Sequence, residues 1–297
     1  MTNLVKLSVT LSLIFSINNV YADREAFEST YVPLAPEKIV IQNASIYDGD
    51  GGEFFETDVL VEDGKIIAIG KDLPFTKEFK VIDASGKWVT PGIIDIHSHM
   101  GVYPAPGVRT SSDGNEATSP VTADVWAEHS IWVQDPQYAL ALTGGVTAFH
   151  ILPGSANLIG GRGVTVKNLQ RNTINSMKFP EAPHSLKMAC GENPKRVYGN
   201  RGQAPSTRMG NAAGYRKSWI QAEGYLRRLN EYEEKSDEAK ELEYAPTRDL
   251  EMETLVGVLK GEILVHNHCY RADEMATMID IAKEFNYKIT AFHHGVE

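Results

Sequence analysis

The sequence predicts an α/β protein in which a small β unit precedes a larger region of alternating strands and helices. Residues 37–90 alternate apolar and polar side chains around turns rich in Gly and Asp, as half-buried strands do. Residues 91–297 instead carry continuous apolar runs separated by helix-forming stretches, a pattern typical of βαβ units. This repetition fits either a (β/α) barrel or a doubly wound sheet.

The first 22 residues differ from both of these parts. Lys6 precedes the apolar stretch LSVTLSLIFSI, and Val20-Tyr21-Ala22 has the small-x-small form of a cleavage site. We therefore expect residues 1–22 to be a secretory signal, with a short N-terminal anchor as the alternative. The mature protein is then periplasmic or extracellular. No later run reaches the roughly 18 apolar residues of a membrane span, so no membrane contact is expected after signal cleavage.

Residues 23–90 are expected to form the small β segment. KIVIQNASIYDGDGG (38–52) is an alternating run that ends in a Gly/Asp turn. TDVLVEDGKIIAIG (57–70) predicts a hairpin around Asp63-Gly64, because Asp-Gly favours the tight turn between two strands. FKVIDASGKWV (79–89) adds a strand pair around Ser85-Gly86.

The region after residue 90 begins with GIIDI (92–96), which predicts a strand buried on both faces. Residues 101–136 are polar and rich in Pro, Gly, Ser and Asp, and a loop of this length is usually functional or mobile. IGGRG (159–163) matches neither the dinucleotide fingerprint nor a P-loop, and we expect a turn there. The other expected strands are 145–152, 163–170, 185–190, 262–269 and 287–295, and the expected helices are 138–143, 216–243, 249–261 and 272–285.

Composition excludes some functions. The chain has 39 acidic and 29 basic residues, a formal net charge of −10, and this lack of a basic excess argues against nucleic acid as a partner. A hydrophobic content of 42% is sufficient for a large core. Cys190 and Cys269 could form a disulfide or remain free thiols, and their spacing does not decide between these states.

Histidines follow three of the apolar runs. His97 and His99 end the first, and because residues i and i+2 share one face of a strand, their side chains project together. EILV leads into His266-Asn267-His268, and KITAF leads into His293-His294. In a barrel the C-terminal strand ends converge on one face, so these imidazoles could share a metal site, for which zinc is a suitable ion. The alternative is that they are unrelated polar residues at strand ends.

Three stretches resemble the amidohydrolase superfamily of metal-dependent hydrolases: VEDGKIIAIG, VIDASGKWVTPGIIDIHSHM and GGVTAFHILPGSANLIGG. The likeness points to the imidazolonepropionase-like and prolidase-like exported branch. It implies a distorted (β/α)8 barrel of the TIM type, with about six strands present in residues 91–297, and a β-sandwich to which residues 23–90 contribute. It also implies one or two divalent metal ions, and a metal-activated water that hydrolyses amide-like carbon–nitrogen bonds, including those of dipeptides.

The resemblance also implies metal ligands. The first-strand H-x-H motif corresponds to His97 and His99. The fifth-strand ligand corresponds to His266, and His268, two residues further on, is the weaker choice.

The sixth-strand ligand precedes a glycine, which identifies His294, with His293 as the alternative. Relatives bridge their metals through a carboxylated lysine or a glutamate. We favour Glu192, because it follows the end of a strand and needs no modification. Lys187 is the alternative bridging ligand, and Lys167 is a third candidate.

One feature of the superfamily has no counterpart here. The aspartate that acts as general base at the end of the eighth strand is expected beyond residue 297, so no catalytic residue is assigned. We therefore expect a C-terminally truncated chain that alone is poorly stable and inactive, because unpaired sheet edges remain. A non-catalytic metal- or ligand-binding protein on the same scaffold is the alternative.

The substrate is expected to be a small molecule. Arg109, Arg162 and Arg208 could bind a substrate carboxylate, or could be ordinary solvated side chains. The loop 101–136 follows the first strand of the expected barrel and is therefore placed to cover its mouth. The sequence leaves the oligomeric state open.

Overall fold

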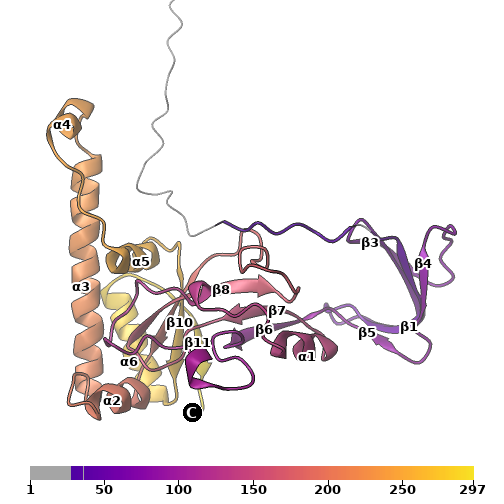
Figure 1. The fold of residues 1–297 in the computed structure, drawn as a ribbon, viewed down its shortest axis with the longest axis horizontal. Coiled ribbons are helices and arrows are strands. Elements are labelled where there is room, and N and C mark those ends of the chain that lie inside the picture. The colour runs from indigo at the N-terminus through magenta and orange to yellow at the C-terminus, as the bar shows by residue number, and fades with distance from the viewer. Residues whose placement is uncertain (1–27, 36) are drawn as a thin grey trace, which may run out of the picture.

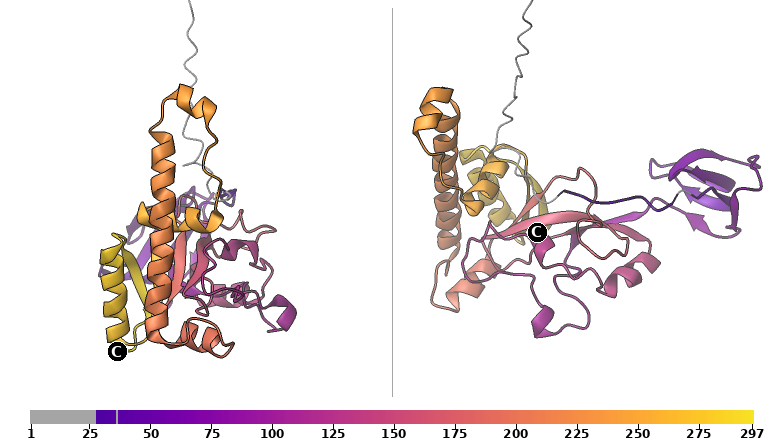
Figure 2. Two further views of the ribbon diagram at one scale, coloured as in Figure 1. Left: turned by 90° about the vertical axis from the view of Figure 1, so that its left-hand side faces the viewer. Right: turned by 45° about the horizontal axis from the view of Figure 1, so that its top comes forward.

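A computed structural model describes residues 28–35 and 37–297, so the expected signal, residues 1–22, lies outside the described residues. The chain forms a five-stranded and a six-stranded sheet, and it passes from one to the other between Val89 and Ile93 (Figure 1). The five-stranded sheet lies at one end of the molecule, and the long helix α3 (Arg208–Glu233) lies at the other end (Figure 1 and the right-hand view of Figure 2).

The five-stranded sheet has the strand order β3-β2-β1-β4, and β5 pairs with β1 beyond the end of β4. Its elements are β1 (Ile39–Tyr47), β2 (Glu53–Glu62), β3 (Lys65–Gly70), β4 (Lys80–Asp83) and β5 (Trp88–Val89). The expected hairpin turn joins β2 to β3, with positive φ angles at Asp63 (53°) and Gly64 (73°) that suit this tight connection. Ala44, Ile46 and Val59 are among its buried core residues.

The six-stranded sheet is nearly closed and barrel-like, with the strand order β11-β10-β9-β8-β7-β6. Its strands are β6 (Ile93–Ser98), β7 (Val146–Ile151), β8 (Ile159–Lys167), β9 (Ser185–Ala189), β10 (Leu264–Cys269) and β11 (Ile289–His294). The pairs β6–β7, β9–β10 and β10–β11 are parallel. This arrangement confirms the predicted α/β class and the incomplete TIM-type barrel of about six strands.

Strand β8 is the exception, because it runs antiparallel to both β7 and β9. It includes IGGRG, so the expected turn at residues 159–163 is wrong. Glycine is required here because other backbone passes very close: a Cβ atom on Gly161, whose φ is +108°, would lie 2.3 Å from the carbonyl oxygen of Val125. The glycines of residues 159–163 therefore allow another segment of backbone to pass close to a strand. Local composition alone does not distinguish this case from a turn.

Strand β6 is less buried than expected. Ile93, Ile94 and Ile96 are 52%, 61% and 63% exposed, so the prediction of burial on both faces is wrong. The reason is position, since β6 is the last strand in the order of this sheet and pairs only with β7 among the described strands. The apolar run therefore predicted the strand correctly, but it did not predict which other strands and helices would cover it.

Helices precede β7, β10 and β11, and the helices that follow β9 lie together at one side of the six-stranded sheet, away from α1 (Gln137–Thr143) (Figure 1). The helices are α1 (Gln137–Thr143), α2 (Glu192–Gly199), α3 (Arg208–Glu233), α4 (Asp237–Leu242), α5 (Leu250–Leu259) and α6 (Ala272–Glu284), with 3-10 turns η1 (Arg109–Ser111) and η2 (Ala127–His129). The expected helix 216–243 is thus two helices. Thr207, Ser236 and Asp249 cap α3, α4 and α5, each accepting a backbone N–H from the first turn. No helix within the described residues is both long enough and apolar enough to span a bilayer.

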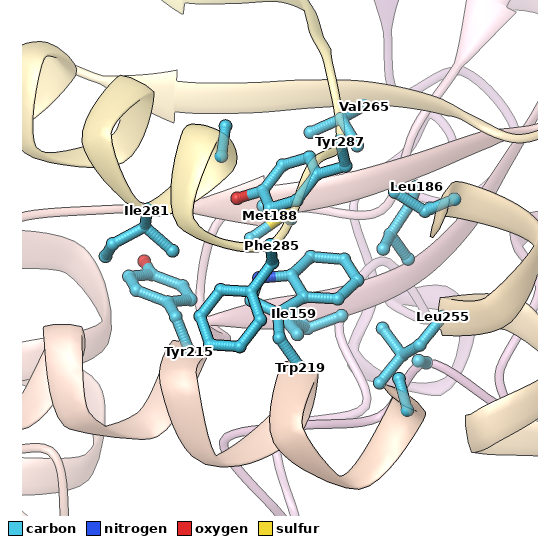
Figure 3. Packing of buried hydrophobic residues seen from close by; sticks show 14 of the residues in the cluster. Ile159, Leu186, Met188, Tyr215, Trp219, Leu255, Val265, Ile281, Phe285 and Tyr287 are labelled. Carbon is cyan, nitrogen blue, oxygen red and sulfur yellow. The ribbon is translucent and has the colours of Figure 1, made fainter. Parts of the chain in front are cut away.

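The largest core lies between α3, α5, α6 and the sheet, as Figure 3 shows. Trp219 of α3 is fully buried there, and its ring lies 4.4 Å from that of Tyr287. A disulfide joins Cys190, just after β9, to Cys269, the last residue of β10, with a Cα–Cα distance of 5.2 Å. The structure thus settles the pairing that the sequence left open. Both sulfurs are buried and lie close to the strand ends that carry candidate ligands.

The loop 101–136 is attached firmly to the barrel. Lys178 Nζ lies 2.8 Å from both carboxylate oxygens of Glu128, and both side chains are almost fully buried. Trp126 forms a backbone bridge with Arg162 of β8, and Asn157 donates hydrogen bonds to the carbonyls of Glu116 and Ser119. These contacts hold the loop over the sheet in a defined position.

Candidate metal centre

Adjacent strands place several candidate ligands on one face of the sheet. In the register between β9 and β10, Lys187 lies beside His266, and Ala189 lies beside His268. In the next register, His268 lies beside His293. Because neighbours in register share a face, as do residues two apart on one strand, Lys187, His266, His268 and His293 point to the same side.

His97 and His99 form the tightest pair of this cluster. Their Nε2 atoms are 3.3 Å apart. His99 Nδ1 lies 2.8 Å from the carbonyl oxygen of Leu152, and because a carbonyl can only accept, Nδ1 must carry the proton. Neutral His99 therefore presents its Nε2 lone pair toward His97, which is the tautomer a metal ligand needs.

His266 and His293 are coupled to each other. His266 Nδ1 lies 2.8 Å from His293 Nε2, and the rings are stacked at 5.1 Å. When His266 donates from Nδ1, its own Nε2 is free as a ligand and His293 serves to orient it. The ring of His97 lies 4.4 Å from that of His293, so the pair also borders the first-strand histidines.

His294 reaches the cluster through an unusual backbone conformation. Consecutive strand residues normally face opposite sides, but His294 has a φ of +74°, which is uncommon for a residue with a side chain. Its ring lies 5.0 Å from that of His97 and 4.4 Å from that of His268. Such conformations concentrate at functional sites. The structure therefore brings both His293 and His294, as well as His268, to the site.

Lys187 occupies the centre of this arrangement. Its side chain is fully buried, and its Nζ donates one hydrogen bond, of 3.1 Å, to the carbonyl oxygen of Pro153. Burial lowers the pKa of Lys187 to about 7. A neutral amine is thus accessible near physiological pH at a position surrounded by imidazoles.

Glu192, which the sequence favoured as the bridging ligand, lies elsewhere. It is exposed in the first turn of α2, with no described contact to the histidines. Lys167 is also remote from the cluster, since its Nζ lies over the rings of Tyr31 and Phe179. The geometry therefore favours Lys187 over both. Strand-end position was a poor guide because a lysine side chain is long enough to act from the middle of its strand.

The electrostatics keep the imidazoles neutral. Burial, followed by the charge of Lys187, lowers the pKa of His97 and His266, that of His266 to about 4. Burial is also the largest cause of the lowered pKa of His99 and His294. Neutral imidazole is the form that binds a metal ion.

These residues fit part of a metal site. Within residues 28–35 and 37–297, no three His, Cys, Asp or Glu side chains are already placed as a complete cage for a metal ion. The 3.3 Å between the Nε2 atoms of His97 and His99 does match two ligands on one tetrahedral zinc, for which bonds of about 2.0–2.1 Å give about 3.3–3.4 Å. A further ligand is needed, and Lys187 is the central group that could supply one after conversion to a carbamate.

The three arginines do not form a clamp around this cluster. Arg109 is exposed in η1. Arg162 lies 4.4 Å over the ring of Trp126 and donates to Thr254 Oγ1, and Arg208 pairs with Glu274 at 2.6 Å. Arg162 and Arg208 are therefore held by protein partners.

The expected cover of the site encloses a cavity of about 440 Å³. Its walls come from the loop 101–136, from the turn after β7 and from the start of β8, and they include Gly114, Asn115, Trp126, Pro153 and Gly160. Because the Pro153 carbonyl also accepts from Lys187, the cavity adjoins the histidine cluster.

Two residues near the site, His150 and Tyr103, were not predicted from the sequence. His150 of β7 has its ring 4.5 Å from that of His266, and its two nitrogens contact Thr165 Oγ1 and Ser185 Oγ. Its place near the end of the run GVTAFHIL was the signal that could have found it. Tyr103, whose ring lies 5.7 Å from that of His99, had no comparable signal because it is a loop residue.

Comparison with solved structures and with curated proteins shows what the chain is similar to. A crystal structure of an amidohydrolase from Thermotoga maritima MSB8 matches with a TM-score of 0.76 and 38% identity, over 85% of this chain and 63% of that one. The chain belongs to the amidohydrolase superfamily. The chain is also 36% identical over 265 residues to amidohydrolase tasK of Hapsidospora irregularis, covering 83% of this chain and 27% of tasK. No protein-family model matches this chain.

A shorter match links the chain to a dihydroorotase of Lactobacillus acidophilus, 42% identical over 85 residues, which is 28% of this chain and 18% of that enzyme. The chain thus spans less than two thirds of the length of each of these relatives. The likeness to the T. maritima structure supports the barrel-like fold of this chain.

Proposed function

We propose that the protein hydrolyses an amide-like carbon–nitrogen bond of a small molecule, using one or two divalent metal ions, of which zinc is the expected one. The observation that carries this proposal is the convergence of His97, His99, His266 and His294, from three strands distant in sequence, around the buried Lys187. The names of the relatives, amidohydrolase and dihydroorotase, also describe enzymes of this reaction class.

His97 and His99 would hold one ion, and His266 and His294 would complete the site. Lys187 would bridge as a carbamate: the neutral amine attacks carbon dioxide, an N–C bond forms, and one proton is released to solvent. The lowered pKa of Lys187, about 7, favours the neutral amine that this step needs. When bound, a divalent cation lowers the pKa of water toward neutrality and polarises a carbonyl oxygen.

The protein's own groups keep the ligands in place. The Leu152 carbonyl fixes the tautomer of His99, and the neighbouring Pro153 carbonyl fixes the amine of Lys187. His293 orients His266 in the same way. Such supporting contacts typically contribute a factor of about 10–100 in metal affinity or activity.

The test uses the full-length protein in a hydrolysis screen of dipeptides, N-acyl amino acids and cyclic amides, together with metal analysis. We expect turnover of at least one class, and loss of both metal and activity in His97→Ala. Lys187→Met should lose activity, while the matched variant Lys167→Met should retain it. A carbonyl signal from ¹³C-labelled carbon dioxide should appear in the wild-type protein and be absent in Lys187→Met.

Different failures have different meanings. Unchanged metal content and activity in His97→Ala would refute the assignment of the site. Bound metal without turnover of any compound would instead support a metal-binding protein without catalysis. An unlabelled Lys187 in an active enzyme would refute the carbamate alone.

We also propose that the protein is exported to the periplasm or beyond. The N-terminal pattern of residues 1–22 supports this, as does the disulfide between Cys190 and Cys269, since such bonds persist in oxidising compartments. Cell fractionation combined with N-terminal sequencing tests it. Cleavage after Ala22 is expected, and an intact N-terminus in the cytoplasmic fraction would contradict the proposal.

A further inference from the structure

Tyr103 and Asn115 form a hydrogen-bonded pair between the histidine cluster and the cavity. The Tyr103 ring meets the His99 imidazole edge-on, with centroids 5.7 Å apart and planes at 82°. Asn115 Nδ2 donates to the Tyr103 hydroxyl, and Asn115 also lines the 440 Å³ cavity. The pair therefore connects His99 with the wall of the cavity.

The direction of this hydrogen bond is fixed by a neighbouring contact. The Ala156 backbone N–H lies 3.1 Å from Asn115 Oδ1, and because a backbone N–H can only donate, this atom must be the amide oxygen. The other end of the amide, Nδ2, can only donate, so the Tyr103 oxygen accepts. The hydroxyl proton of Tyr103 is consequently not used in this pair, and no hydrogen bond from it to another described residue is present.

The surrounding chain holds both side chains closely. A Cβ atom on Gly114 would lie 2.2 Å from the Tyr103 ring, and one on Gly154 would lie 2.2 Å from Asn115 Nδ2. Gly154 directly follows Leu152 and Pro153, whose carbonyls hold His99 and Lys187. The turn 152–154 thus positions the two candidate ligands and the pair together.

We propose that Tyr103 is a catalytic residue that donates its free hydroxyl proton to the substrate's carbonyl oxygen as that oxygen becomes negatively charged, with Asn115 as its positioning residue. This inference rests on the proposed hydrolytic function. Tyr103 is 37% exposed, so part of the residue is open to a bound molecule. A donor aimed at a developing oxyanion typically contributes about 10²–10³-fold to kcat.

Replacing the amide NH2 group of Asn115 by an oxygen atom tests this role of Tyr103. Asn115→Asp keeps the shape and still accepts from Ala156, but a carboxylate can only accept, so it takes the Tyr103 proton away from the substrate. In full-length, zinc-loaded protein, Tyr103→Phe and Asn115→Asp should each lower kcat about 100-fold with little change in KM. The double variant should be no worse than Tyr103→Phe alone. Tyr138→Phe is the matched control, because its hydroxyl already donates to the Met100 carbonyl, and it should stay within about twofold of wild type.

A binding measurement separates this inference from the proposed function. Inorganic phosphate, a tetrahedral oxyanion, should bind the zinc-loaded wild-type protein about 10–100-fold more tightly than Tyr103→Phe or Asn115→Asp, as expected for loss of one hydrogen bond to a charged group. Equal kcat in Asn115→Asp and wild type, or equal phosphate affinity in all variants, overturns the role of Tyr103. A wild-type protein that hydrolyses nothing in the screen counts against the proposed function, and the phosphate result then decides the role of Tyr103 as a donor by itself.

Discussion

Reduction of the disulfide between Cys190 and Cys269 should destabilise the protein by several kilocalories per mole. The two residues are 79 apart in sequence, so the bond closes a long loop that contains α2, α3, α4 and α5. In the chain-entropy treatment, a loop of this length corresponds to about 4.5 kcal/mol at 25 °C, between the values of about 3 and 4.7 kcal/mol for 15 and 100 residues. Reduction returns this conformational freedom to the unfolded chain.

Urea unfolding of the full-length protein measures the effect. Intrinsic tryptophan fluorescence, to which the fully buried Trp219 of the main core contributes, should report unfolding of the region that the bond closes. With a urea dependence of about 3 kcal/mol per M, reduction should move the midpoint down by about 1.5 M. A variant with both cysteines changed to alanine is the control, because a reductant should leave its midpoint unchanged.

Two results would refute this reasoning. A midpoint that moves by less than about 0.3 M on reduction would show that the bond contributes less than about 1 kcal/mol. Alkylation of two thiols in urea without a reductant would show that Cys190 and Cys269 are not joined. In the expected case, the single variants Cys190→Ala and Cys269→Ala should each lose nearly as much stability as the double variant, because either change removes the same bond.

Three further predictions concern other parts of the molecule. Lys178→Met should cost about 3–5 kcal/mol in chemical unfolding by leaving the buried Glu128 carboxylate unpaired, whereas adding Glu128→Leu should recover most of the loss; equal stability of the two variants would contradict this. Burial, with help from nearby acids, raises the pKa of Glu251 to about 7, so the folded state holds a proton that the unfolded chain has released between about pH 4.5 and 7. Stability should therefore fall as pH rises through this window, by about 1 kcal/mol after allowance for solvent screening, and a Glu251→Gln variant with the same pH profile as wild type would disprove the assignment. Gly154→Ala should lower kcat at least about tenfold by displacing the Asn115 amide 2.2 Å away, while Gly224→Ala in α3, whose added Cβ meets nothing closer than 3.8 Å, should not; equal kinetics of the two would refute the packing argument.

The sequence was sufficient to predict most strands and the approach of the histidines. Apolar runs ending in His97, His266 and His293 placed imidazoles at the same kind of position on three strands, and the barrel topology brought them together. Period-two alternation and the Asp63-Gly64 turn identified the hairpin of the first sheet for a similar reason. Both inferences rest on local patterns that tertiary structure preserves.

The remaining features depend on contacts that a linear pattern does not contain. Residues 159–163 became a strand because Val125 and its neighbours pass close to the glycines. Glu192 was favoured over Lys187 on strand-end position, but the register between β9 and β10 sets Lys187 beside His266. Likewise the Tyr103–Asn115 pair joins two parts of one loop through side chains, which neither periodicity nor spacing can indicate.

The central claim is that His97, His99, His266 and His294 bind metal together with Lys187. The most direct measurement is a crystal structure of the zinc-loaded full-length protein with anomalous diffraction data at the zinc edge. The account predicts an anomalous peak bounded by the Nε2 atoms of His97 and His99, with continuous density from Lys187 Nζ to a carbamate beside it. An anomalous peak elsewhere, or a bare Lys187 amine still bonded to the Pro153 carbonyl with zinc bound, would contradict it.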